Sequence, residues 1–369
     1  DMLSFVNDYS EGAHPKILER LNGTNFEQLA GYGSDCYCEQ AKEKIRAAIG
    51  CPEAEIFFLV GGTQTNQVVL DALLRAYDGV IAAESGHVNV HEAGAIEHGG
   101  HKVLALGHTD GKLSAETVRE YVETFYADGN YTHMVFPGAV YISHPTEYGT
   151  LYTKAELAAL YEVCREYALY LFLDGARLPA ALVAQGNDLD ITDFGKYCDA
   201  FYIGGTKNGL LFGEAVVITN DALKPHFRNM IKQRGGMLAK GRLLGIQFDE
   251  LFTDDLYFKI SEKAVRQAKR IAVPGCHASG FIALVYPLIS AGLLAPDVLL
   301  SCYSLTGYSG GGKKMIADYE SPDRPAHSKL DAPKSYGLGL AHKHLPEMQK
   351  ISGLAHTPMF VPVVCDYYC

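Results

Sequence analysis

The chain has 369 residues, of which 48 % are hydrophobic and 20 % are charged, as is typical of a globular protein with a large core and two or more domains. Its net charge of -11 and the lack of a long basic run argue against a nucleic-acid partner, whose phosphates would be repelled. No apolar stretch approaches the ~18 residues that a membrane span needs, and no signal peptide is recognised at the start, so we expect no membrane partner.

The nine cysteines are odd in number and scattered, with no Cys-x-x-Cys pair and no zinc-ligand spacing among them. This usage favours reduced thiols over a disulfide framework, and therefore a cytoplasmic location without a metal site. Most of these cysteines are expected to be small buried hydrophobes. The exception is Cys276, which belongs to a motif described below.

Short apolar strands alternate with amphipathic helices over the first ~270 residues, and this rhythm predicts a mostly parallel sheet covered by helices. The expected strands are, in chain order, residues 56–60, 79–83, 102–106, 169–173, 201–203 and 215–218. Helices are expected over residues 64–76, after an N-cap at Ser114, from a capping box at Thr153 and Glu156 to residue 167, and over residues 255–272.

The character of the sequence changes at Pro274, where Pro274-Gly275 ends the last of these helices. The residues that follow hold several glycine turns and a proline-rich loop over residues 321–333. We therefore predict a domain of residues 1–272 followed by a second domain of residues 273–369.

Lys207 stands in the segment Tyr202-Ile-Gly-Gly-Thr-Lys-Asn208, in which a short apolar strand ends in two glycines, a hydroxyl residue and the lysine. A lysine just past a strand end can meet a ligand at the carboxyl edge of a sheet. Its amine forms an imine with an aldehyde cofactor once burial or neighbouring charges favour the neutral form. By itself the pattern is also typical of a surface lysine in a loop.

Asp174 directly follows the predicted strand at residues 169–173 and is itself followed by Gly-Ala-Arg177. A carboxylate in this place would keep a pyridinium nitrogen protonated, which makes the ring an electron sink. Arg177 can bind a carboxylate or a phosphate bidentately. The alternatives are a helix cap at Asp174 and a surface ion pair at Arg177. Because the gap to Lys207 accommodates one helix and one strand, both residues could lie on one sheet edge.

The segment Val60-Gly-Gly-Thr-Gln-Thr-Asn66 lies between a predicted strand and a predicted helix. Glycine backbone and helix-start N–H groups bind phosphate, and Thr63 adds a hydroxyl donor, although any tight turn gives a similar loop. His87 follows in residues 84–94 and could stack its imidazole on a pyridine ring. The alternative for a single histidine of this kind is a structural role.

The order of these features is a phosphate loop, a histidine, an Asp with an Arg, and then a Lys. In this order, residues 2–272 resemble the threonine aldolases and related β-eliminating lyases, which are fold-type I pyridoxal-phosphate (PLP) enzymes. Further matching stretches are residues 7–15, 32–35 and 234–237. The resemblance implies an α/β fold: a fold-type I PLP-transferase-like, three-layer large domain with a mostly parallel sheet.

The resemblance also implies roles for individual residues. Lys207 would bind the cofactor as an imine, Asp174 would pair with its ring nitrogen, and His87 would stack on the ring. Ser10 and Arg177 would help to hold the substrate carboxylate. Pyridoxal 5'-phosphate would be bound by Gly62, Thr63, Gln64, His87, Asp174, Arg177 and Lys207.

The reaction implied is the cleavage of a β-hydroxy amino acid into glycine and an aldehyde, with His87, His91 or a water that they hold as the base. The commonest aldolase pattern has Ser-Gly-Thr in the phosphate loop, whereas Gly-Gly-Thr-Gln stands here, and the lysine is followed by Asn208. Threonine itself is therefore not implied as the substrate. A small amino-acid substrate and a homodimer or homotetramer are expected.

Residues 273–369 resemble instead the later half of N-acetyl-γ-glutamyl-phosphate reductases, which is an α+β segment of reductase C-terminal-domain type. The matching stretches are residues 274–280, 306–314, 339–347 and 360–364. The resemblance implies that Cys276 attacks an acyl phosphate with help from His342 or His344, before NADPH delivers hydride. A position near a helix start would favour the Cys276 thiolate, and the alternative is a buried cysteine in a turn.

The dinucleotide-binding domain of such a reductase is not recognisable before Cys276, because no Gly-x-Gly-x-x-Gly follows a first strand. We interpret the chain as a chimera of a PLP-binding large domain and a partial reductase-like domain. Three functions stay open: a PLP-dependent aldehyde-lyase of the threonine-aldolase type, an NADPH-dependent reductase fragment or fusion, and a PLP-binding chain with little turnover.

Overall fold

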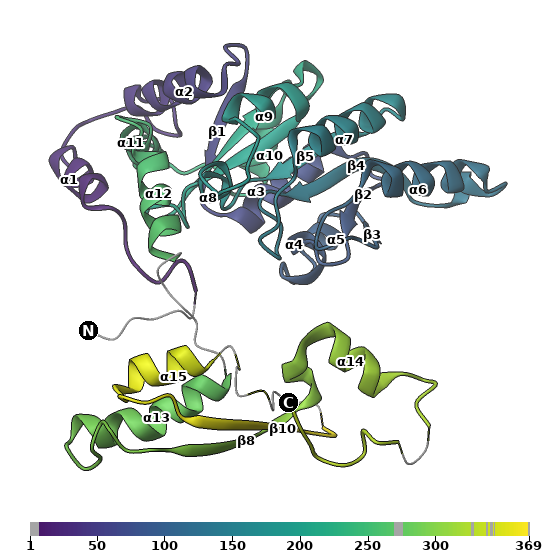
Figure 1. The fold of residues 1–369 in the computed structure, drawn as a ribbon. Helices are drawn as coiled ribbons and strands as arrows, with labels where there is room; N and C mark the ends of the chain where they lie inside the picture. The colour runs from purple at the N-terminus through teal and green to yellow at the C-terminus, as the bar shows by residue number, and fades with distance from the viewer. Residues whose placement is uncertain are drawn as a thin grey trace. The chain divides into compact units, whose positions relative to one another are not determined.

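The computed structural model describes residues 7–268, 276–325, 328–336, 339, 342 and 344–367, with only the backbone described at residues 276 and 310–314. Internal contacts divide the chain into two compact units, Asp1–Lys269 and Arg270–Cys369 (Figure 1). No helix in these described parts is long and apolar enough to cross a membrane.

Unit 1 is built on a seven-stranded sheet with the order β1-β7-β6-β5-β4-β2-β3. The strands are β1 (Glu55–Leu59), β2 (Asp78–Ala83), β3 (Val103–Leu106), β4 (Phe136–Ser143), β5 (Tyr170–Asp174), β6 (Ala200–Gly204) and β7 (Glu214–Ile218). Strands β6, β5, β4, β2 and β3 run parallel, whereas β7 pairs antiparallel with both β6 and β1. The predicted, mostly parallel α/β sheet is therefore confirmed.

Strand β4 lies in the middle of the sheet, between β5 and β2, and was not among the strands predicted from the sequence. Its second and third residues, Pro137 and Gly138, are typical of turns, so the sequence pattern did not indicate a strand here. The pairing of β4 with β2 shifts register between Gly79 and Val80, which accommodates this irregular start. The rest of β4 is buried and leads to Ser143 at the carboxyl edge.

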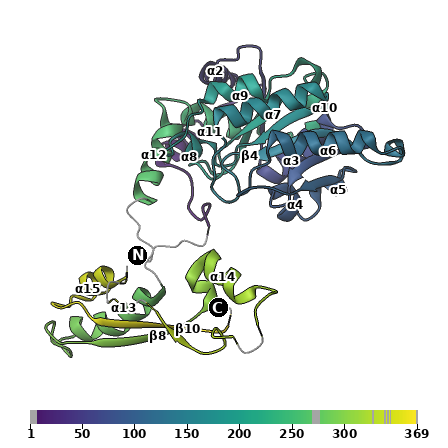
Figure 2. The ribbon, with the colours of Figure 1, turned by 45° about the vertical axis from the view of Figure 1, so that its right-hand side comes forward.

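Helices cover both faces of the sheet, which makes three layers (Figure 2). One face carries α2 (Cys36–Ile49), α6 (Ala115–Ala127), α7 (Lys154–Glu166), α9 (Ile191–Tyr197) and α11 (Arg242–Leu251), and the other carries α3 (Gly62–Leu73), α4 (His87–Val90), α5 (Ala95–His98) and α10 (Phe227–Gln233). Alternate strand residues face opposite layers: Leu171 and Leu173 pack in one core, and Phe172 packs in the other.

The predicted helix starts are confirmed at two positions. Ser114 caps α6 by accepting a hydrogen bond from the Thr117 N–H at 3.0 Å. Thr153 and Glu156 form a reciprocal capping box at the start of α7. Helices α1 (Pro15–Gly23), α8 (Leu178–Leu182) and α12 (Leu256–Ala268) complete unit 1, and the predicted extension of α12 over residues 269–272 lies outside the described residues.

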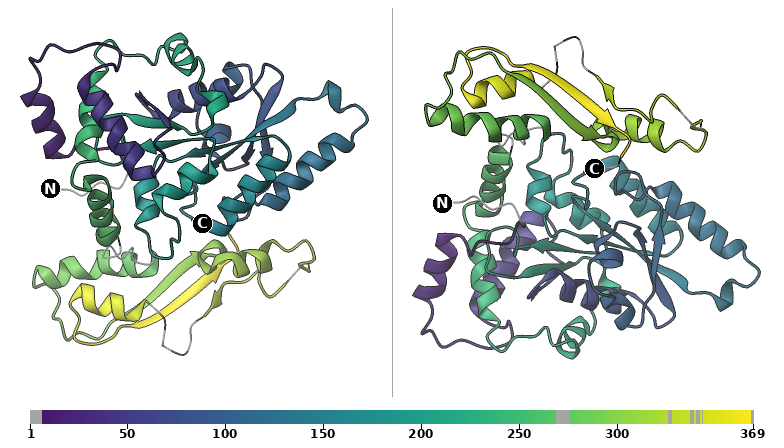
Figure 3. Two further views of the ribbon diagram at one scale, coloured as in Figure 1. Left: turned by 90° about the horizontal axis from the view of Figure 1, so that it is seen from above. Right: turned by 90° about the horizontal axis from the view of Figure 1, so that it is seen from below.

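Unit 2 is an α+β unit with the elements α13 (Cys276–Ser290), β8 (Ser301–Gly307), α14 (Gly312–Glu320), β9 (Lys334–Ser335), α15 (Leu345–Ser352) and β10 (Met359–Cys365). Strand β10 runs parallel to β8 and antiparallel to β9. Helices α13 and α15 lie side by side (Figure 3). Phe281, Met348 and Phe360 belong to the core of this unit.

Candidate active site

The carboxyl ends of the parallel strands bring the predicted residues to one edge of the sheet, where Ser143 of β4 pairs in register with Asp174 of β5. This edge carries a cavity of about 270 Å³. Six of the predicted site residues line the cavity: Gly62, Thr63, His87, Asp174, Arg177 and Lys207. Ligands of open α/β sheets bind at this kind of edge.

Asp174 is 6 % exposed, and its carboxylate accepts hydrogen bonds from the hydroxyls of Tyr202 at 2.5 Å and Tyr141 at 2.6 Å. It also accepts from the N–H of Ala176 at 3.0 Å, so Asp174 stabilises its own turn as well as facing the cavity. Burial and the neighbouring Asp174 raise the pKa of both Tyr141 and Tyr202, so both hydroxyls keep their protons and donate them to the carboxylate.

The turns that carry Asp174 and Lys207 are in direct contact. A Cβ atom on Gly175 would lie 2.0 Å from the carbonyl oxygen of Tyr202, and one on Gly204 would lie 2.4 Å from that of Ala176. The Asn208 side chain donates to the carbonyls of both Ala176, at 2.9 Å, and Gly204, at 2.8 Å. The glycines and Asn208 therefore hold the two turns that carry Asp174 and Lys207 against each other, a role for Asn208 that the sequence did not reveal.

The loop before α3 has the features of a phosphate site. Gly61 is the N-cap of α3, so the first N–H groups of the helix lack partners within it. A Cβ on Gly62 would lie 3.3 Å from the Tyr202 hydroxyl, so glycine leaves room for close approach. The predicted ligand Gln64 does not line the cavity, and its side chain accepts from the Val60 N–H at 3.4 Å.

His87 is the first residue of α4, and its Nδ1 lies 2.7 Å from Oε1 of Glu92. The hydrogen bond to Glu92 raises the pKa of His87, with burial acting in the opposite sense and the charge of Asp174 adding to the increase. The backbone N–H of His87 donates to Glu147 at 2.9 Å. His91, the other candidate base, is exposed, and its ring centroid lies 5.7 Å from that of His87.

Arg177 is paired with Asp8, its Nε lying 2.5 Å from Oδ2 and its Nη2 lying 3.1 Å from Oδ1. An exposed ion pair, the alternative considered for Arg177, is thus present, and Arg177 also lines the cavity. Ser10 does not line the cavity, and its hydroxyl donates to Oδ1 of Asn7 at 2.8 Å.

Glu214 is a further cavity residue that the sequence analysis did not single out. It is 4 % exposed, and it accepts from the Thr206 hydroxyl at 2.8 Å and from the Gly205 N–H at 3.1 Å. Burial raises its pKa to about 8. Glu214, Glu92 and the two tyrosines are polar residues within or beside apolar strands and helices, and only their tertiary partners identify them.

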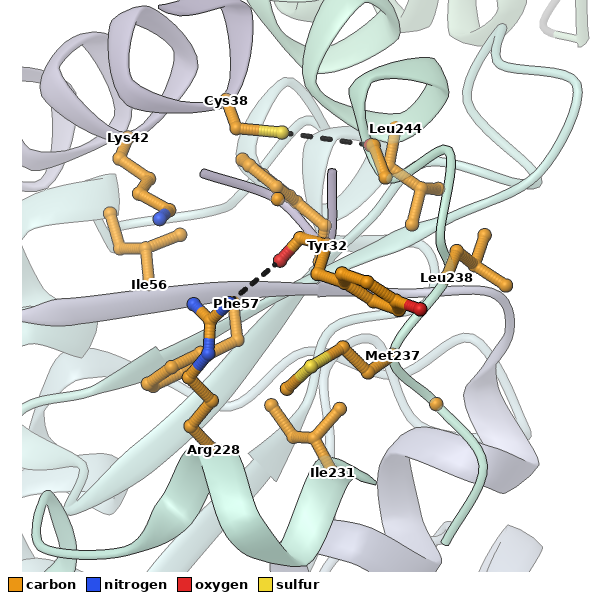
Figure 4. A pocket seen from close by; sticks show the side chains of 14 residues that line it. Tyr32, Cys38, Lys42, Ile56, Phe57, Arg228, Ile231, Met237, Leu238 and Leu244 are labelled. Carbon is orange, nitrogen blue, oxygen red and sulfur yellow. Dashed lines mark hydrogen bonds between the residues drawn. The ribbon is translucent and has the colours of Figure 1, made fainter. Parts of the chain in front are cut away.

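A second cavity, of about 40 Å³, lies where Tyr32 meets Met237 and Leu238 (Figure 4). Arg228 donates to the Tyr32 carbonyl at 3.0 Å across it. It is lined by neither Asp174 nor Lys207, so we place the candidate site at the sheet edge. No group of three or more His, Cys, Asp or Glu in the described residues is arranged to hold a metal ion.

In unit 2, the predicted residues His342 and His344 lie together, with ring centroids 4.7 Å apart. His277 joins them, with its ring centroid 5.9 Å from that of His344, and was not predicted. Burial, followed by the charges of His344 and His342, lowers the pKa of His277. Cys276 is the first residue of α13, and its side chain lies outside the description.

The residues at the sheet edge fit pyridoxal phosphate. The Lys207 amine and the Asp174 carboxylate, which accepts hydrogen bonds from two tyrosines, line one cavity. Gly62, at the start of α3, lines the same cavity and leaves room there for close approach. These are the groups that an aldehyde, a pyridine nitrogen and a phosphate require.

Unit 2 has counterparts among known proteins. A sequence model described as semialdehyde dehydrogenase, dimerisation domain, matches residues 276–368. The N-acetyl-γ-glutamyl-phosphate reductase of Chelativorans sp. is 49 % identical over 111 residues, which are 30 % of this chain and 34 % of the reductase. The predicted resemblance of this part to such reductases is confirmed, and the chain spans about a third of their length.

A larger part of the chain, which includes most of unit 1, matches a second group of known proteins. A sequence model of the β-eliminating lyases matches residues 10–298. The low specificity L-threonine aldolase of Pseudomonas aeruginosa is 30 % identical over 291 residues, covering 78 % of this chain and 82 % of that protein. A threonine aldolase structure from Leishmania major superposes with a TM-score of 0.70 at 44 % identity, over 79 % of this chain and 80 % of that one.

Aspartate aminotransferase from Thermus thermophilus shares the fold alone. Its structure superposes with a TM-score of 0.54 at 16 % identity, over 77 % of this chain and 71 % of that one. These neighbours confirm the predicted fold-type I architecture. By the match over residues 10–298 and the identity to threonine aldolases, the chain belongs to the β-eliminating lyase family.

Proposed function

We propose that the chain is a PLP-dependent lyase of the threonine-aldolase type, which cleaves a β-hydroxy amino acid into glycine and an aldehyde. The observation that carries this proposal is that Asp174 and Lys207 line one cavity, on two turns held together by Asn208 and two glycines. The threonine aldolases among its relatives supply the reaction class.

Four features of the chain would hold the cofactor. Lys207 would bind its aldehyde, Asp174 its ring nitrogen, and the N–H groups at the start of α3, with Thr63, its phosphate. His87 would lie against the ring. When bound, pyridoxal phosphate supplies an electron sink for the bond that breaks at Cα.

The other residues bind the substrate and move a proton. Arg177, which lines the cavity, would hold the substrate carboxylate. Ser10, whose hydroxyl donates to Asn7 outside the cavity lining, would have to turn from that bond to help. His87 would accept the β-hydroxyl proton through Nε2, because its Nδ1 is engaged by Glu92. His91, or a water held by the two histidines, is the alternative base.

The oligomeric state, the domain boundary and the cellular location are part of the same proposal. The chain would form a homodimer or homotetramer and would work in the cytoplasm on a small amino acid. Residues 1–272 would form the PLP-binding large domain and residues 273–369 the partial reductase-like domain of a chimera. In the second domain Cys276 would be the reductase-type nucleophile, with His342 or His344 as its partner.

The test is the release of glycine from L-threonine and from L-allo-threonine, assayed separately with the PLP-loaded protein and with the Lys207→Ala variant. Glycine above the level of the variant supports the lyase. A PLP absorbance band without glycine from either amino acid would favour the chain with little turnover. A protein that develops no such band would overturn the proposal.

A further inference from the structure

Glu92 is fully buried and in contact with two side chains of the candidate site. Its Oε1 lies 2.7 Å from Nδ1 of His87 and 2.7 Å from Nδ2 of Asn66, and the Glu92 side chain is 0 % exposed. The Asn66 Nδ2 also lies 3.4 Å from Oδ2 of Asp174. A chain of hydrogen bonds therefore runs from His87 through Glu92 and Asn66 to Asp174.

The chemistry of these groups sets the direction of each bond. A carboxylate oxygen can only accept, so the His87 Nδ1 that faces it must carry a proton. In the neutral ring, Nε2 is then the nitrogen that accepts. The Asn66 amide is oriented in the same way, because turning it would place its oxygen against the carboxylates of both Glu92 and Asp174.

We propose that Glu92 is a positioning residue, which fixes His87 as the Nδ1–H tautomer with Nε2 available as the proton acceptor. Through Asn66 it also holds His87 in a constant relation to Asp174. The proposal rests on the proposed lyase function, in which His87 accepts the β-hydroxyl proton, and it names the residue that prepares His87 for that step.

The surroundings of His87 are mixed in charge. Glu92 and Asp174 favour its protonated form, whereas burial and Lys207 oppose it. Glu147 accepts a hydrogen bond from the His87 backbone N–H, and the His91 ring centroid lies 5.7 Å from that of His87. Among these groups, the hydrogen bond to Glu92 has the largest effect on the pKa of His87. Removing the charge of Glu92 should therefore lower that pKa.

The first measurement is ¹⁵N NMR of the histidine rings in the wild-type protein without PLP, with His87 assigned by its loss in His87→Asn. The protonated and unprotonated ring nitrogens give separate signals, so above the pKa of His87 we expect a protonated Nδ1 and an unprotonated Nε2. A neutral His87 protonated on Nε2 would overturn the proposal. This measurement depends neither on lyase activity nor on the folding of a Glu92 variant.

The second measurement compares Glu92→Gln with Glu97→Gln, a matched change at an exposed carboxylate of the same segment. An amide can turn either its oxygen or its nitrogen toward Nδ1, so we expect mixed tautomers and a lower pKa for His87 in Glu92→Gln. With PLP bound, kcat of Glu92→Gln should fall about tenfold or more, since a positioned base contributes roughly 10²–10⁴-fold. The acidic limb of its pH–rate profile should move to lower pH, because the pKa of His87 is lower.

We expect Glu97→Gln to match the wild type in both measurements. An unchanged His87 pKa and pH–rate profile in Glu92→Gln would overturn the proposal. If the wild-type tautomer is as expected but no glycine is released, the lyase function fails while the positioning by Glu92 stands.

Discussion

Arg177 holds the carboxylate of Asp8 in a bidentate ion pair at the cavity, with Nε to Oδ2 at 2.5 Å and Nη2 to Oδ1 at 3.1 Å. Burial would raise the pKa of Asp8, but the hydrogen bond and charge of Arg177 outweigh it and lower that pKa. Asp8 is therefore ionised at neutral pH. It occupies the guanidinium in the geometry that a substrate carboxylate would use.

We expect Asp8→Asn to lower KM for the amino-acid substrate and to leave kcat almost unchanged, because the substrate no longer competes with an anion for Arg177. Both partners of the ion pair are more than 40 % exposed, so the gain should not exceed about 1 kcal/mol, or roughly fivefold in KM. Steady-state kinetics with Glu11→Gln as an exposed control would measure it. A higher KM in Asp8→Asn would show instead that Asp8 helps to orient Arg177.

Lys207→Ala should lose the covalent attachment of PLP, since Lys207 is the lysine that lines the cavity beside Asp174. The check is borohydride reduction of the PLP-loaded protein, followed by mass spectrometry of its peptides. The label should appear on the peptide that contains Lys207 in the wild type and in the exposed-lysine control Lys16→Ala. Label on the same peptide region in Lys207→Ala would contradict the assignment.

The sequence alone was enough to predict the residues that stand at the ends of strands and at the start of α3. Asp174, Lys207 and Gly62 were found in this way, because parallel strands end at one edge and a helix start follows the first of them. Local patterns of apolar residues and glycines specify such positions without reference to distant parts of the chain.

The residues that hold these groups in place could not be predicted. Tyr141 lies in β4, a strand concealed by Pro137 and Gly138, and Tyr202 was indistinguishable from a core aromatic. Glu92 became significant only when folding buried it against His87. Such positions depend on partners many residues away, which strand and helix periodicity does not encode.

Asp174→Asn should lower kcat far more than it lowers PLP content. An amide cannot keep the pyridine nitrogen protonated, whereas the phosphate contacts at the start of α3 remain. We expect a loss on the order of 100-fold, which corresponds to about 2.7 kcal/mol in the activation barrier. PLP absorbance and glycine release would be measured on the same samples. A kcat equal to that of the wild type would show that Asp174 serves only as a cap of its own turn.

Glu214 should make unfolding depend on pH. Burial raises its pKa to about 8 in the folded chain, whereas a glutamate in an unfolded chain titrates near ~4.3. Between these values the folded state binds a proton that the unfolded state does not, so the free energy of unfolding falls as pH rises through this window. Glu214→Gln lacks this proton and should lose less stability between about pH 5 and pH 8.

The test is thermal unfolding of the wild type and Glu214→Gln at about pH 5 and about pH 8. The control is Glu120→Gln, which removes the same charge at an exposed position. The difference should amount to several degrees, since each kcal/mol shifts the Tm of a domain of this size by about 2–4 °C. Equal decreases in Tm for both variants would show that Glu214 does not carry the pH dependence.

Cys276 should show no reductase activity with N-acetyl-γ-glutamyl phosphate and NADPH. Unit 2 does place His277 with His342 and His344, so histidine partners are present near the start of α13. Hydride transfer, however, needs the nicotinamide within about 3–3.5 Å of the reacting carbon, and therefore a dinucleotide domain in register with the cysteine.

The residues before Cys276 instead follow the β-eliminating lyases, and they contain no Gly-x-Gly-x-x-Gly to bind a pyrophosphate. An accessible thiolate could still react with an acyl phosphate, because that step needs no nucleotide. The assay is NADPH oxidation by the wild type against Cys276→Ser, with thioester formation followed by mass spectrometry. Cysteine-dependent NADPH oxidation above background would make the chain a bifunctional enzyme, whereas a thioester without NADPH oxidation would show a reductase domain that keeps its nucleophile and has lost its hydride donor.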